Sequence, residues 1–599
     1  MPSLDELGEV HDCDVLVLGA GLAGTFAAVK LSDFGQKNVI LVEKGKVGRT
    51  GMSAFGAGVM LCKFPDDDDE AWMREMVEHS EYLADQRWIQ IMMEHGYDKI
   101  KELASFGVTF RMKDGDFERK VGRGQREDRV QRNVMCQNFQ MMTMMRKRLR
   151  KTQVRLVERV SVTDLLVDGN RVVGAVGFNS RSGDWHIFKA RAVINAAGSV
   201  AYKGTFLGQR NVTGDAWAMM IRRGVEMISL EFATANTCPK DYDLAGLNML
   251  VGLGGKFING LGQPFMHHYD PVYADRASLP RLTASMAAEV KIGKGPIYLD
   301  ARHLTDEQLE VLRFTNPVPM RILETTGVDV RKAPIEWMPA MIGFGTGRGG
   351  GARINEACET NLPGLYAVGD AAWSSYQGVS GVGGSNFAYC MVSGEIAARA
   401  AMSFIAGQPE ARCDAGEAQQ LKEMVFAPLR RRAGMLPEDV TYRLQKILFP
   451  YETLLIRRGD RLQAALTEVE YLRDHEIPYL KARDMQDVRN CVEVANMVTT
   501  AELLLRSALY RTESRGSNVR EDCPNTDNIN WLKWVTIQCA PEGGVLLNTV
   551  ELPFEQWPVQ PKRKKTLHPV FAGMKKSAAE QETTSGKPKR RTWTSAVVR

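Results

Sequence analysis

Two glycine-rich motifs, far apart in the sequence, constrain this chain more than any other feature. The first, GAGLAG at Gly19–Gly24, follows the apolar run Cys13–Leu18 and leads into Leu22–Phe34, whose apolar residues recur with helical spacing. The second, LPGLYAVGDAA, lies at Leu362–Ala372. A strand, a glycine turn and a helix in this order form the βαβ unit that binds a dinucleotide. The two motifs together predict one extended dinucleotide held across a single α/β domain.

The first motif assigns a role to each glycine. Gly19 permits the tight turn, Gly21 lets the backbone approach the diphosphate, and Gly24 lets the helix pack on the strand. Glu43 ends the next apolar strand, where a carboxylate accepts hydrogen bonds from ribose hydroxyls and repels a 2′-phosphate. An NADP site is therefore disfavoured.

The second motif indicates which dinucleotide is bound. Its strand stops at Gly369, and Asp370 can accept hydrogen bonds from a polyol such as a flavin ribityl chain, although an ordinary strand-end aspartate is the alternative. The N-terminus of the helix that begins near Ser385 can face the flavin ring. These features predict FAD. The predicted cofactor-binding residues are Gly19, Gly21, Leu22, Ala23, Gly24, Glu43, Lys44, Thr50, Gly51, Gly56, Ala197, Gly198, Asp215, Gly369, Asp370, Ser385 and Asn386.

The positive charge of the chain is concentrated at its C-terminal end. The formal net charge is +5, but Lys and Arg greatly exceed Asp and Glu from Lys562 onward, so the rest of the chain is mildly acidic. A basic segment with little apolar material does not offset the entropy of ordering. We therefore expect residues 546–599 to form a basic, largely disordered tail. A contact with a partner subunit or an anionic membrane surface is the alternative, and nucleic acid is not expected.

Cysteine spacing and hydropathy exclude other classes of protein. The ten cysteines form no CxxC pair, so no metal site or iron–sulfur centre is predicted in this chain. The early acidic residues Asp5, Glu6 and Glu9 argue against a signal peptide, and no segment reaches the ~20 apolar residues of a membrane span. The expected location is the cytoplasm, either free or peripheral to the inner membrane.

The pattern of elements predicts the domain organisation. Short strands separated by turns fill Val154–Ala197, and mixed short elements with glycine turns follow, before long amphipathic stretches begin beyond Gln408. The predicted fold class is α/β: a Rossmann-like FAD-binding domain at 1–232 and 337–408, an inserted α+β capping domain at 233–336, and a C-terminal helical domain at 409–545.

In this order the motifs resemble the flavoprotein subunits of succinate dehydrogenase and fumarate reductase, and more distantly adenylylsulfate reductase and L-aspartate oxidase. The likeness covers about Asp12–Trp534 and includes the segments Thr213–Phe232, Gly254–Pro271, Gly293–Asp300 and Ala508–Trp534. The last of these, ALYRTESRGSNVREDCPNTDNINWLKW, is highly specific for the family.

The resemblance implies an FAD-dependent oxidoreductase that transfers a hydride between a substrate C–C bond and flavin N5. A cap arginine moves the proton in such proteins; aligned on SLPR it is Arg281 here, with Arg276 as second candidate. Because arginine is essentially always protonated, a fixed charge that orients an anionic substrate is the alternative role. The resemblance also implies a small-molecule substrate and a separate iron–sulfur or other electron-transfer subunit.

Departures from the family pattern indicate a different substrate. Arg49–Thr50–Gly51 stands where covalently flavinylated relatives have a histidine, so FAD is expected to be non-covalent. Asn236 and Gly381 stand near positions where dicarboxylate enzymes have a histidine and an arginine, and Pro339–Arg353 contains no histidine. Succinate, fumarate and aspartate are therefore not expected, unless Arg348 or Arg353 binds the carboxylate.

Gln377 replaces a further family histidine beside the flavin. Arg348 and Gln377 are thus the predicted substrate-binding residues. The favoured function is FAD-dependent oxidation or reduction of an organic acid or its thioester. Sulfur chemistry like that of adenylylsulfate reductase, and a flavin electron-transfer subunit without its own substrate, are the alternatives.

Overall fold

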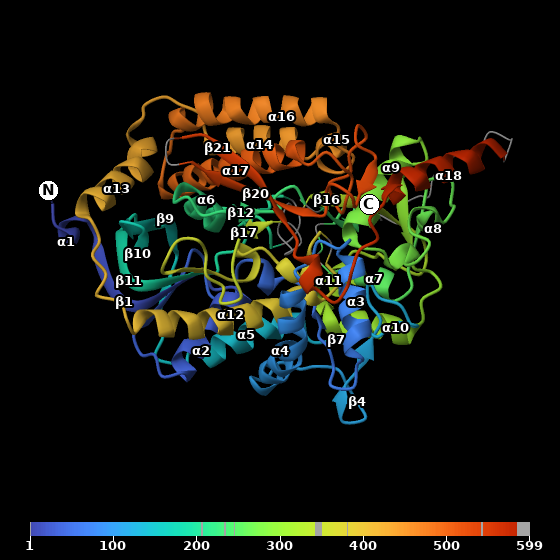
Figure 1. Cartoon of the computed structure of the whole chain (residues 1–599), viewed down its shortest axis with the longest axis horizontal. Coiled ribbons are helices and arrows are strands. Elements are labelled where there is room, and N and C mark those ends of the chain that lie inside the picture. The colour runs from blue at the N-terminus through green and yellow to red at the C-terminus, as the bar shows by residue number, and fades with distance from the viewer. Residues whose placement is uncertain are drawn as a thin grey trace.

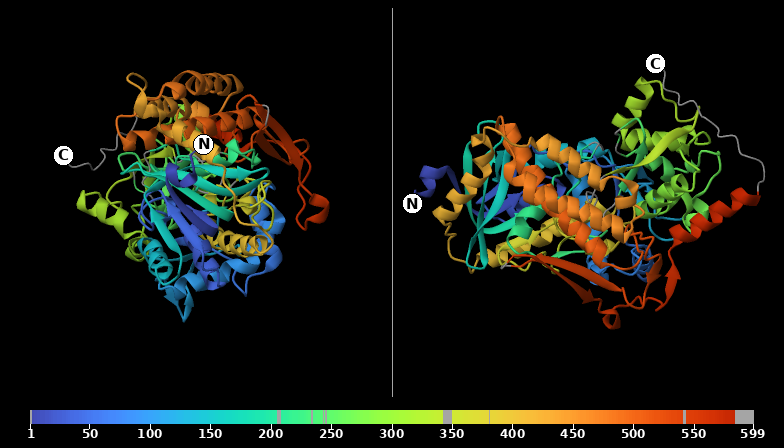
Figure 2. Two further views of the ribbon diagram at one scale, coloured as in Figure 1. Left: turned by 90° about the vertical axis from the view of Figure 1, so that its left-hand side faces the viewer. Right: turned by 90° about the horizontal axis from the view of Figure 1, so that it is seen from above.

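The computed structural model describes residues 2–204, 208–232, 235–242, 244, 246–341, 350–379, 381–540 and 543–583. Figure 1 shows a sheet with its helices near the N-terminus, a cap at the opposite end, and a helical layer along one side. The view from above in Figure 2 places the N-terminus and the last helix at opposite ends of the long axis.

The central sheet of the first domain combines parallel and antiparallel strands. Its order is β8-β2-β1-β11-β10-β9, and β18 also pairs with β11. The five strands β8, β2, β1, β11 and β18 form the parallel part of the sheet. Their carboxyl ends therefore meet at one edge, where both glycine motifs lie. The strands are β1 (Glu9–Leu18), β2 (Val39–Glu43), β8 (Arg155–Glu158), β9 (Val160–Asp168), β10 (Arg171–Asn179), β11 (Trp185–Asn195) and β18 (Leu365–Ala367).

Helices α2 (Leu22–Asp33) and α12 (Ser385–Ile405) pack against each other beside this sheet. Their contact is close because Gly394 lies against the backbone of Ala23, where an added Cβ would be 2.8 Å from the Ala23 oxygen. The domain also contains α1 (Leu4–Leu7), η1 (Met52–Ala54), β3 (Val59–Leu61), α3 (Asp69–His79), α4 (Gln86–Ser105), β4 (Met112–Lys113), β5 (Asp116–Phe117), β6 (Arg119–Lys120), β7 (Asn133–Met135), α5 (Asn138–Leu149), α6 (Asp215–Arg222), η3 (Gly369–Ala371) and η4 (Ser375–Gln377).

The cap is a four-stranded antiparallel sheet with helices, of order β13-β16-β15-β14. The expected boundary at residue 336 falls inside β16; because this strand pairs with β13 and β15, the cap continues to Met341. Its elements are β13 (Ala235–Pro239), α7 (Met249–Gly252), β14 (Lys256–Ile258), α8 (Met266–Tyr269), η2 (Ala274–Arg276), α9 (Leu279–Lys291), β15 (Ile297–Asp300), α10 (Asp306–Thr315), α11 (Pro317–Thr325) and β16 (Ile335–Met341).

The helical layer follows the return to the first domain. Its longest helix, α17, packs against α6, α14 and α16. A second sheet of order β17-β12-β20-β21 joins the layer to the first domain. The elements are β12 (Met227–Ile228), β17 (Gly351–Ala352), α13 (Ala415–Arg430), α14 (Pro437–Leu448), α15 (Tyr451–Leu454), α16 (Gly459–Tyr471), η5 (Leu472–Glu476), η6 (Ile477–Tyr479), α17 (Met485–Tyr510), β19 (Asn525–Asp527), β20 (Lys533–Cys539) and β21 (Val545–Glu551).

The C-terminal segment contradicts the expectation of a largely disordered tail. After β21 come η7 (Phe554–Gln556), β22 (Lys565–Leu567), which pairs with β19, and α18 (Pro569–Thr583). Helix α18 packs against α8 and α9 of the cap, where Val570 and Ser577 are buried and the Lys294 ammonium donates to the Ser577 hydroxyl at 3.0 Å. The count of basic residues concealed a short apolar stripe at helical spacing.

The structure confirms the predicted fold class, with a Rossmann-like domain, an inserted α+β cap and a helical C-terminal part. In the residues described, no helix has both the length and the apolar character needed to cross a bilayer.

Candidate functional site

A first cavity of about 120 Å³ lies at the carboxyl edge of the central sheet. We call it the nucleotide cavity. It brings together many predicted cofactor residues from both glycine motifs, α6 and the strand that ends before Ala197. Those lining it are Gly19, Gly21, Leu22, Ala23, Glu43, Lys44, Thr50, Gly51, Ala197, Gly198, Asp215 and Asp370.

The turn around this cavity requires its glycines. Gly19 has φ +90°, a conformation that L side chains rarely adopt, and a Cβ there would lie 2.6 Å from the Ala196 oxygen. A Cβ on Gly24 would lie 1.9 Å from the Gly19 oxygen, so the first turn of α2 packs directly on the glycine turn. Gly24 lies behind the cavity, as expected for a packing residue. The cradle therefore fits an extended dinucleotide with its diphosphate at the N-terminus of α2.

Glu43 is held at this cavity by backbone and hydroxyl donors. Its Oε2 accepts from the Ala20 N–H at 2.8 Å, while Oε1 accepts from the Gly45 N–H at 2.8 Å and the Thr50 hydroxyl at 3.0 Å. A carboxylate offers about four lone-pair positions. One position therefore remains for a ribose hydroxyl.

Lys44 closes the same end of the cavity through an ion pair. Its Nζ lies 2.7 Å from Asp215 Oδ2 and 3.1 Å from Glu493 Oε1 of α17. Burial opposes the charge of Lys44, but the two carboxylates outweigh it, and the pKa of Lys44 is raised. Lys44 thus stays charged, and its contacts with Asp215 and Glu493 tie the cavity to the helical layer.

A second cavity of about 200 Å³ lies between the first domain and the cap. We call it the cap-side cavity. It shares Met52, Ser53, Asp370 and Cys390 with the nucleotide cavity, so the two cavities are adjacent. Predicted cofactor residues Gly56 and Asn386 also line it. Its polar side chains include Arg123, Asn133, Asn236 and Asn248.

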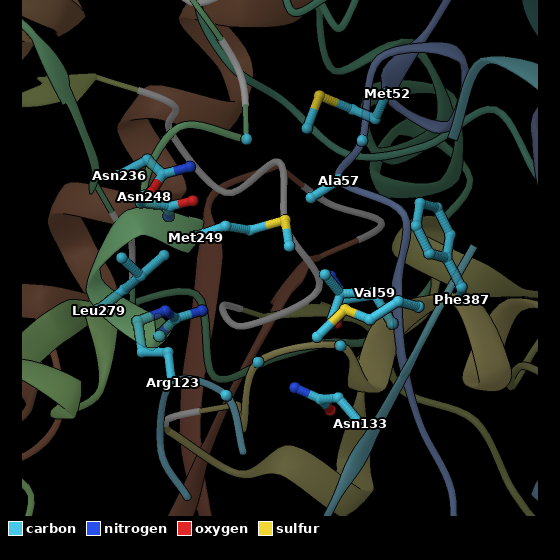
Figure 3. A pocket seen from close by; sticks show the side chains of 18 of the residues that line it. Met52, Ala57, Val59, Arg123, Asn133, Asn236, Asn248, Met249, Leu279 and Phe387 are labelled. Carbon is cyan, nitrogen blue, oxygen red and sulfur yellow. Dashed lines mark hydrogen bonds between the residues drawn. The ribbon is translucent and has the colours of Figure 1, made fainter. Parts of the chain in front are cut away.

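Figure 3 shows how these side chains face one another. Arg123 and Leu279 lie on the same side as Asn236 and Asn248, and Phe387 lies on the opposite side. Apolar surface thus surrounds a small number of polar groups, as in most small-molecule sites.

Backbone contacts hold Arg123 at the junction of two domains. Its carbonyl oxygen accepts from the Gly383 N–H at 3.0 Å, just before α12. The next residue, Gly124, donates its N–H to the Arg276 oxygen of the cap at 2.6 Å. The loop that carries Arg123 is therefore fixed both to the cofactor helix and to the cap.

The two cap asparagines are oriented by each other. Asn248 donates its side-chain amide to Asn236 Oδ1 at 2.8 Å, and the same oxygen accepts from the Thr237 N–H at 2.9 Å. The Asn236 amide nitrogen and the Asn248 oxygen then point toward the cavity in Figure 3. This pair offers one donor and one acceptor to a ligand.

The predicted catalytic residue Arg281 lies on the first turn of α9, which Ser278 caps. Leu279 on the same turn lines the cap-side cavity, whereas Arg281 is outside the described linings of both cavities. Its Nη2 lies 3.3 Å from Glu81 Oε1, and its side chain is 12% exposed.

A buried network from the C-terminal motif holds Glu81 in place. The Arg515 guanidinium donates to the Glu81 carbonyl oxygen at 2.7 Å, and the Gly516 N–H donates to Glu81 Oε2 at 3.2 Å. Glu513 accepts from Arg511 and Arg515, each at 2.8 Å, with all three side chains almost fully buried. The family-specific segment Ala508–Trp534 therefore fixes the position of Glu81, which pairs with Arg281.

His568 belongs to the same neighbourhood, although sequence analysis did not identify it. It is fully buried; burial first, and then the charges of Arg281 and Arg515, place its pKa well below 6.5. His568 is therefore neutral and adds no positive charge beside Arg281 and Arg515.

The other predicted site residues have different surroundings. The Arg276 guanidinium lies 3.7 Å from the carboxylate of Glu127, which is well exposed. Arg276 is not among the described lining residues of either cavity. Gln377 is buried behind the cap-side cavity and donates to Asn386 Oδ1 at 2.7 Å. Arg348 lies outside the described residues.

Gly369 and Ser385 are buried beside α12 and not on the described linings. Gly369 has φ +57°, and a Cβ there would lie 2.8 Å from Ala23 Cβ. The Ser385 hydroxyl donates to the Val382 oxygen at 2.7 Å. Gly369 precedes Asp370 in η3, and Ser385 precedes Asn386 at the start of α12.

Sequence reasoning missed several lining residues. Ser53 accepts a hydrogen bond from the Leu22 N–H at 3.1 Å, and Arg123, Asn133 and Asn248 supply cavity polarity. The only available signal was the arginine between two glycines in GRG at Gly122–Gly124. Such a short pattern is too common to identify a site without the fold.

A cavity at the glycine turn and an adjacent cavity under the cap define a dinucleotide-dependent oxidoreductase. Family comparison supports this class: the model described as "FAD binding domain" matches residues 14–387, and that described as "Fumarate reductase flavoprotein C-term" matches residues 442–566. The chain belongs to the flavoprotein subunit family of succinate dehydrogenase and fumarate reductase, and it is an FAD-dependent oxidoreductase.

Individual relatives agree over nearly the whole chain. A subunit of the fumarate reductase (CoM/CoB) from Methanothermobacter marburgensis is 28% identical over 86% of this chain and 96% of its own length. The succinate dehydrogenase flavoprotein subunit of Rickettsia bellii is 27% identical over 90% of this chain and 95% of its own.

Solved structures share the fold. The FrdA chain of Escherichia coli quinol fumarate reductase superposes with a TM-score of 0.82 at 21% identity, over 93% of this chain and 99% of that one. Adenylylsulfate reductase from Archaeoglobus fulgidus gives 0.77 at 22% identity, over 93% and 98%.

Proposed function

We propose that this protein transfers a hydride between FAD and a C–C bond of an organic acid or its thioester, and exchanges electrons with a separate redox subunit. The observation that carries the proposal is that the nucleotide cavity adjoins, and shares four lining residues with, a largely apolar cavity that contains Arg123. When bound, FAD supplies the two-electron chemistry through flavin N5.

Arg123 and the asparagine pair would orient the substrate. A guanidinium binds a carboxylate or other anionic group through charge-assisted hydrogen bonds, worth roughly 1.5–3 kcal/mol each. Asn236 and Asn248 add one donor and one acceptor on the same side. Leu279 and Met249 would cover the hydrocarbon part and exclude water.

Arg281 and Glu81 would move the proton. Arginine alone is a poor acid, because its pKa exceeds about 12. Glu81 Oε1, 3.3 Å from Arg281 Nη2, provides an acceptor and donor through which the guanidinium can be re-protonated. Leu279, on the same first turn of α9, lines the cavity, so the Arg281 backbone lies near the cavity wall although its side chain is outside the described lining.

Two further features complete the proposal. Thr50 lines the nucleotide cavity and donates a hydrogen bond to Glu43, which supports a non-covalent FAD. Acid precipitation should therefore release the flavin from the protein.

The cysteines in the described residues are dispersed and most are buried, which supports electron exchange through a separate iron–sulfur or other redox subunit.

Anaerobic photoreduction followed by mixing with acceptors tests the function. We expect α,β-unsaturated acids or their thioesters to reoxidise the flavin. Reoxidation by adenylylsulfate alone would support sulfur chemistry, and reoxidation by redox carriers alone would support an electron-transfer subunit; either result would overturn the proposal.

A further inference from the structure

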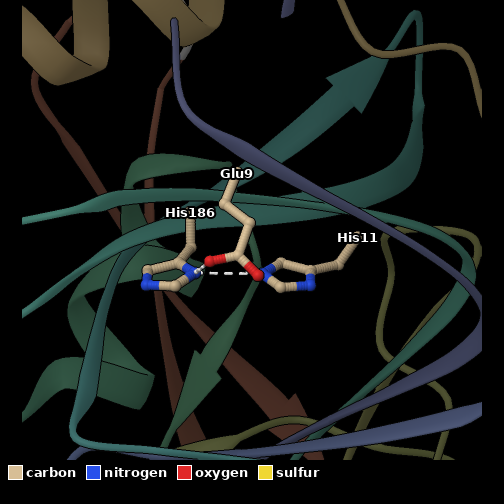
Figure 4. Close-up of side chains that lie close together, drawn as sticks. All are labelled: Glu9, His11 and His186. Carbon is tan, nitrogen blue, oxygen red and sulfur yellow. Dashed lines mark hydrogen bonds and ion pairs between the residues drawn. The ribbon is translucent and has the colours of Figure 1, made fainter. Parts of the chain in front are cut away.

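We propose that Glu9, His11 and His186 form a binding site for a divalent transition-metal ion of the Zn²⁺ type. The three residues gather on one face where β1 and β11 begin (Figure 4). Glu9 and His11 are two residues apart on a strand and so point to the same face. In the parallel register, Glu9 pairs with His186.

Donor spacing in this cluster suits a metal ion. His11 Nε2 lies 2.9 Å from His186 Nδ1; Glu9 Oε1 lies 3.5 Å from His11 Nε2, and Glu9 Oε2 lies 3.4 Å from His186 Nδ1. Ligand atoms around a tetrahedral zinc with bonds of ~2.0–2.2 Å are about 3.3 Å apart. Small side-chain rotations therefore bring all three groups within bonding distance of one ion.

The donor atoms of this cluster converge on one point. Both imidazole side chains are 8% exposed, and their facing nitrogens lie 2.9 Å apart with the Glu9 carboxylate beside both. The space between these two nitrogens holds at most one hydrogen, so nitrogen and carboxylate lone pairs face each other there. A cation compensates this convergence of lone pairs.

The charged groups around the cluster do not take the place of a cation at the two histidines. Among the described residues outside the cluster, Asp12, Arg155 and Asp184 act electrostatically on the two rings. Asp12 is paired with Lys189 at 2.7 Å, and Arg155 donates to the Asp12 carbonyl oxygen at 3.2 Å. Glu9 is 62% exposed, so an ion enters from solvent and keeps an open position for water. Nitrogen and carboxylate ligands favour Zn²⁺, Co²⁺ or Ni²⁺ over Mg²⁺ or Ca²⁺.

The site would act as a clamp and not as part of the flavin chemistry. Glu9 and Leu18 mark opposite ends of β1, which are about 30 Å apart at the usual strand rise. A metal at Glu9 would join the start of β1 to the start of β11 and stabilise the folded state by mass action.

Titration of the chelator-treated, flavin-loaded protein with Co²⁺ tests the proposal. A second cluster, His267, His268 and Glu580, must first be disabled by His268→Gln. In that background we expect one Co²⁺ per chain with visible absorption of a four-coordinate ion, and a Zn²⁺-dependent rise in unfolding temperature. Glu9→Gln, an exposed change that keeps the shape, should weaken binding at least tenfold, and His11→Gln more.

Asp12→Asn is the matched control, because it removes one negative charge from the same strand outside the cluster; its Co²⁺ affinity should change less than threefold. Flavin content should be equal in every variant. Absence of stoichiometric Co²⁺ binding, or equal weakening by Glu9→Gln and Asp12→Asn, would overturn the proposal.

Discussion

The nucleotide cavity takes a continuous wall from one short glycine turn, whereas the cap-side cavity takes its polar side chains from separate loops and strands. Leu18–Ala23 supplies that stretch of wall, and the second glycine motif adds Asp370. In the second cavity, Arg123 precedes β7, Asn133 begins it, and Asn236 and Asn248 belong to the cap. Under the proposed roles, cofactor recognition depends on the local geometry of the glycine turn, and substrate recognition depends on domain assembly.

The largest effect is expected at the glycine turn. Gly24→Ala places a Cβ 1.9 Å from the Gly19 oxygen, so α2 must shift away from the turn. We expect loss of bound flavin and destabilisation of at least ~1–3 kcal/mol, measured by the flavin-to-protein ratio and by denaturant unfolding. Gly407→Ala, with no atom within 4 Å, is the control. A fully flavinated Gly24→Ala protein would contradict the comparison.

Arg281→Gln should have the next largest effect, on turnover with the acid that reoxidises the flavin. Loss of a general acid lowers kcat by roughly 10²- to 10⁴-fold, while the flavin spectrum stays normal because Arg281 is outside the described nucleotide cavity lining. Arg276→Gln should lower kcat far less, since that side chain faces Glu127. Equal losses in both variants would remove the assignment.

Glu395→Gln tests the ion pairs that join α12 to α2 and α4 beside the central sheet. Burial alone would raise the pKa of Glu395, but Lys99, Arg399 and Lys30 lower it from 4.5 to about 2. This stabilisation is present above pH 4.5 and is lost as pH falls toward 2. The variant should lose about 3 kcal/mol of unfolding free energy at pH 7.

Denaturant unfolding across this pH range measures the difference, which should shrink as pH falls below 4.5. Glu468→Gln, on the exposed face of α16, is the control. A difference independent of pH would show that Glu395 acts through packing and not through charge.

Arg123→Gln should have the smallest effect and the most selective one. Loss of one charge-assisted hydrogen bond costs about 1.5–3 kcal/mol, a roughly 10- to 150-fold fall in kcat/KM. Flavin content should not change. Arg126→Gln, in the same loop but paired with Asp128 at the surface, is the matched control. A fall in flavin content instead would show that the two cavities are not separable.

Many residues that sequence reasoning selected line the nucleotide cavity, because the signals for them are local. Gly19, Glu43 and Asp370 are each recognisable from the few residues around them, and the fold brings them together as expected. Sequence reasoning did not predict Arg123 or Asn248, which acquire meaning only when the cap closes over α12. It also missed the docking of α18, because net charge concealed the apolar positions Val570 and Met574.

The sequence by itself determined the family, the cofactor and the glycine turn, because a left-handed φ and a close backbone approach admit few residue types. Only the tertiary structure decided which side chains surround the substrate position, that Glu81 faces Arg281, and that His11 and His186 meet on one sheet face. Those contacts join residues far apart in the chain, and their partners are chosen by packing and strand register, which no local pattern records.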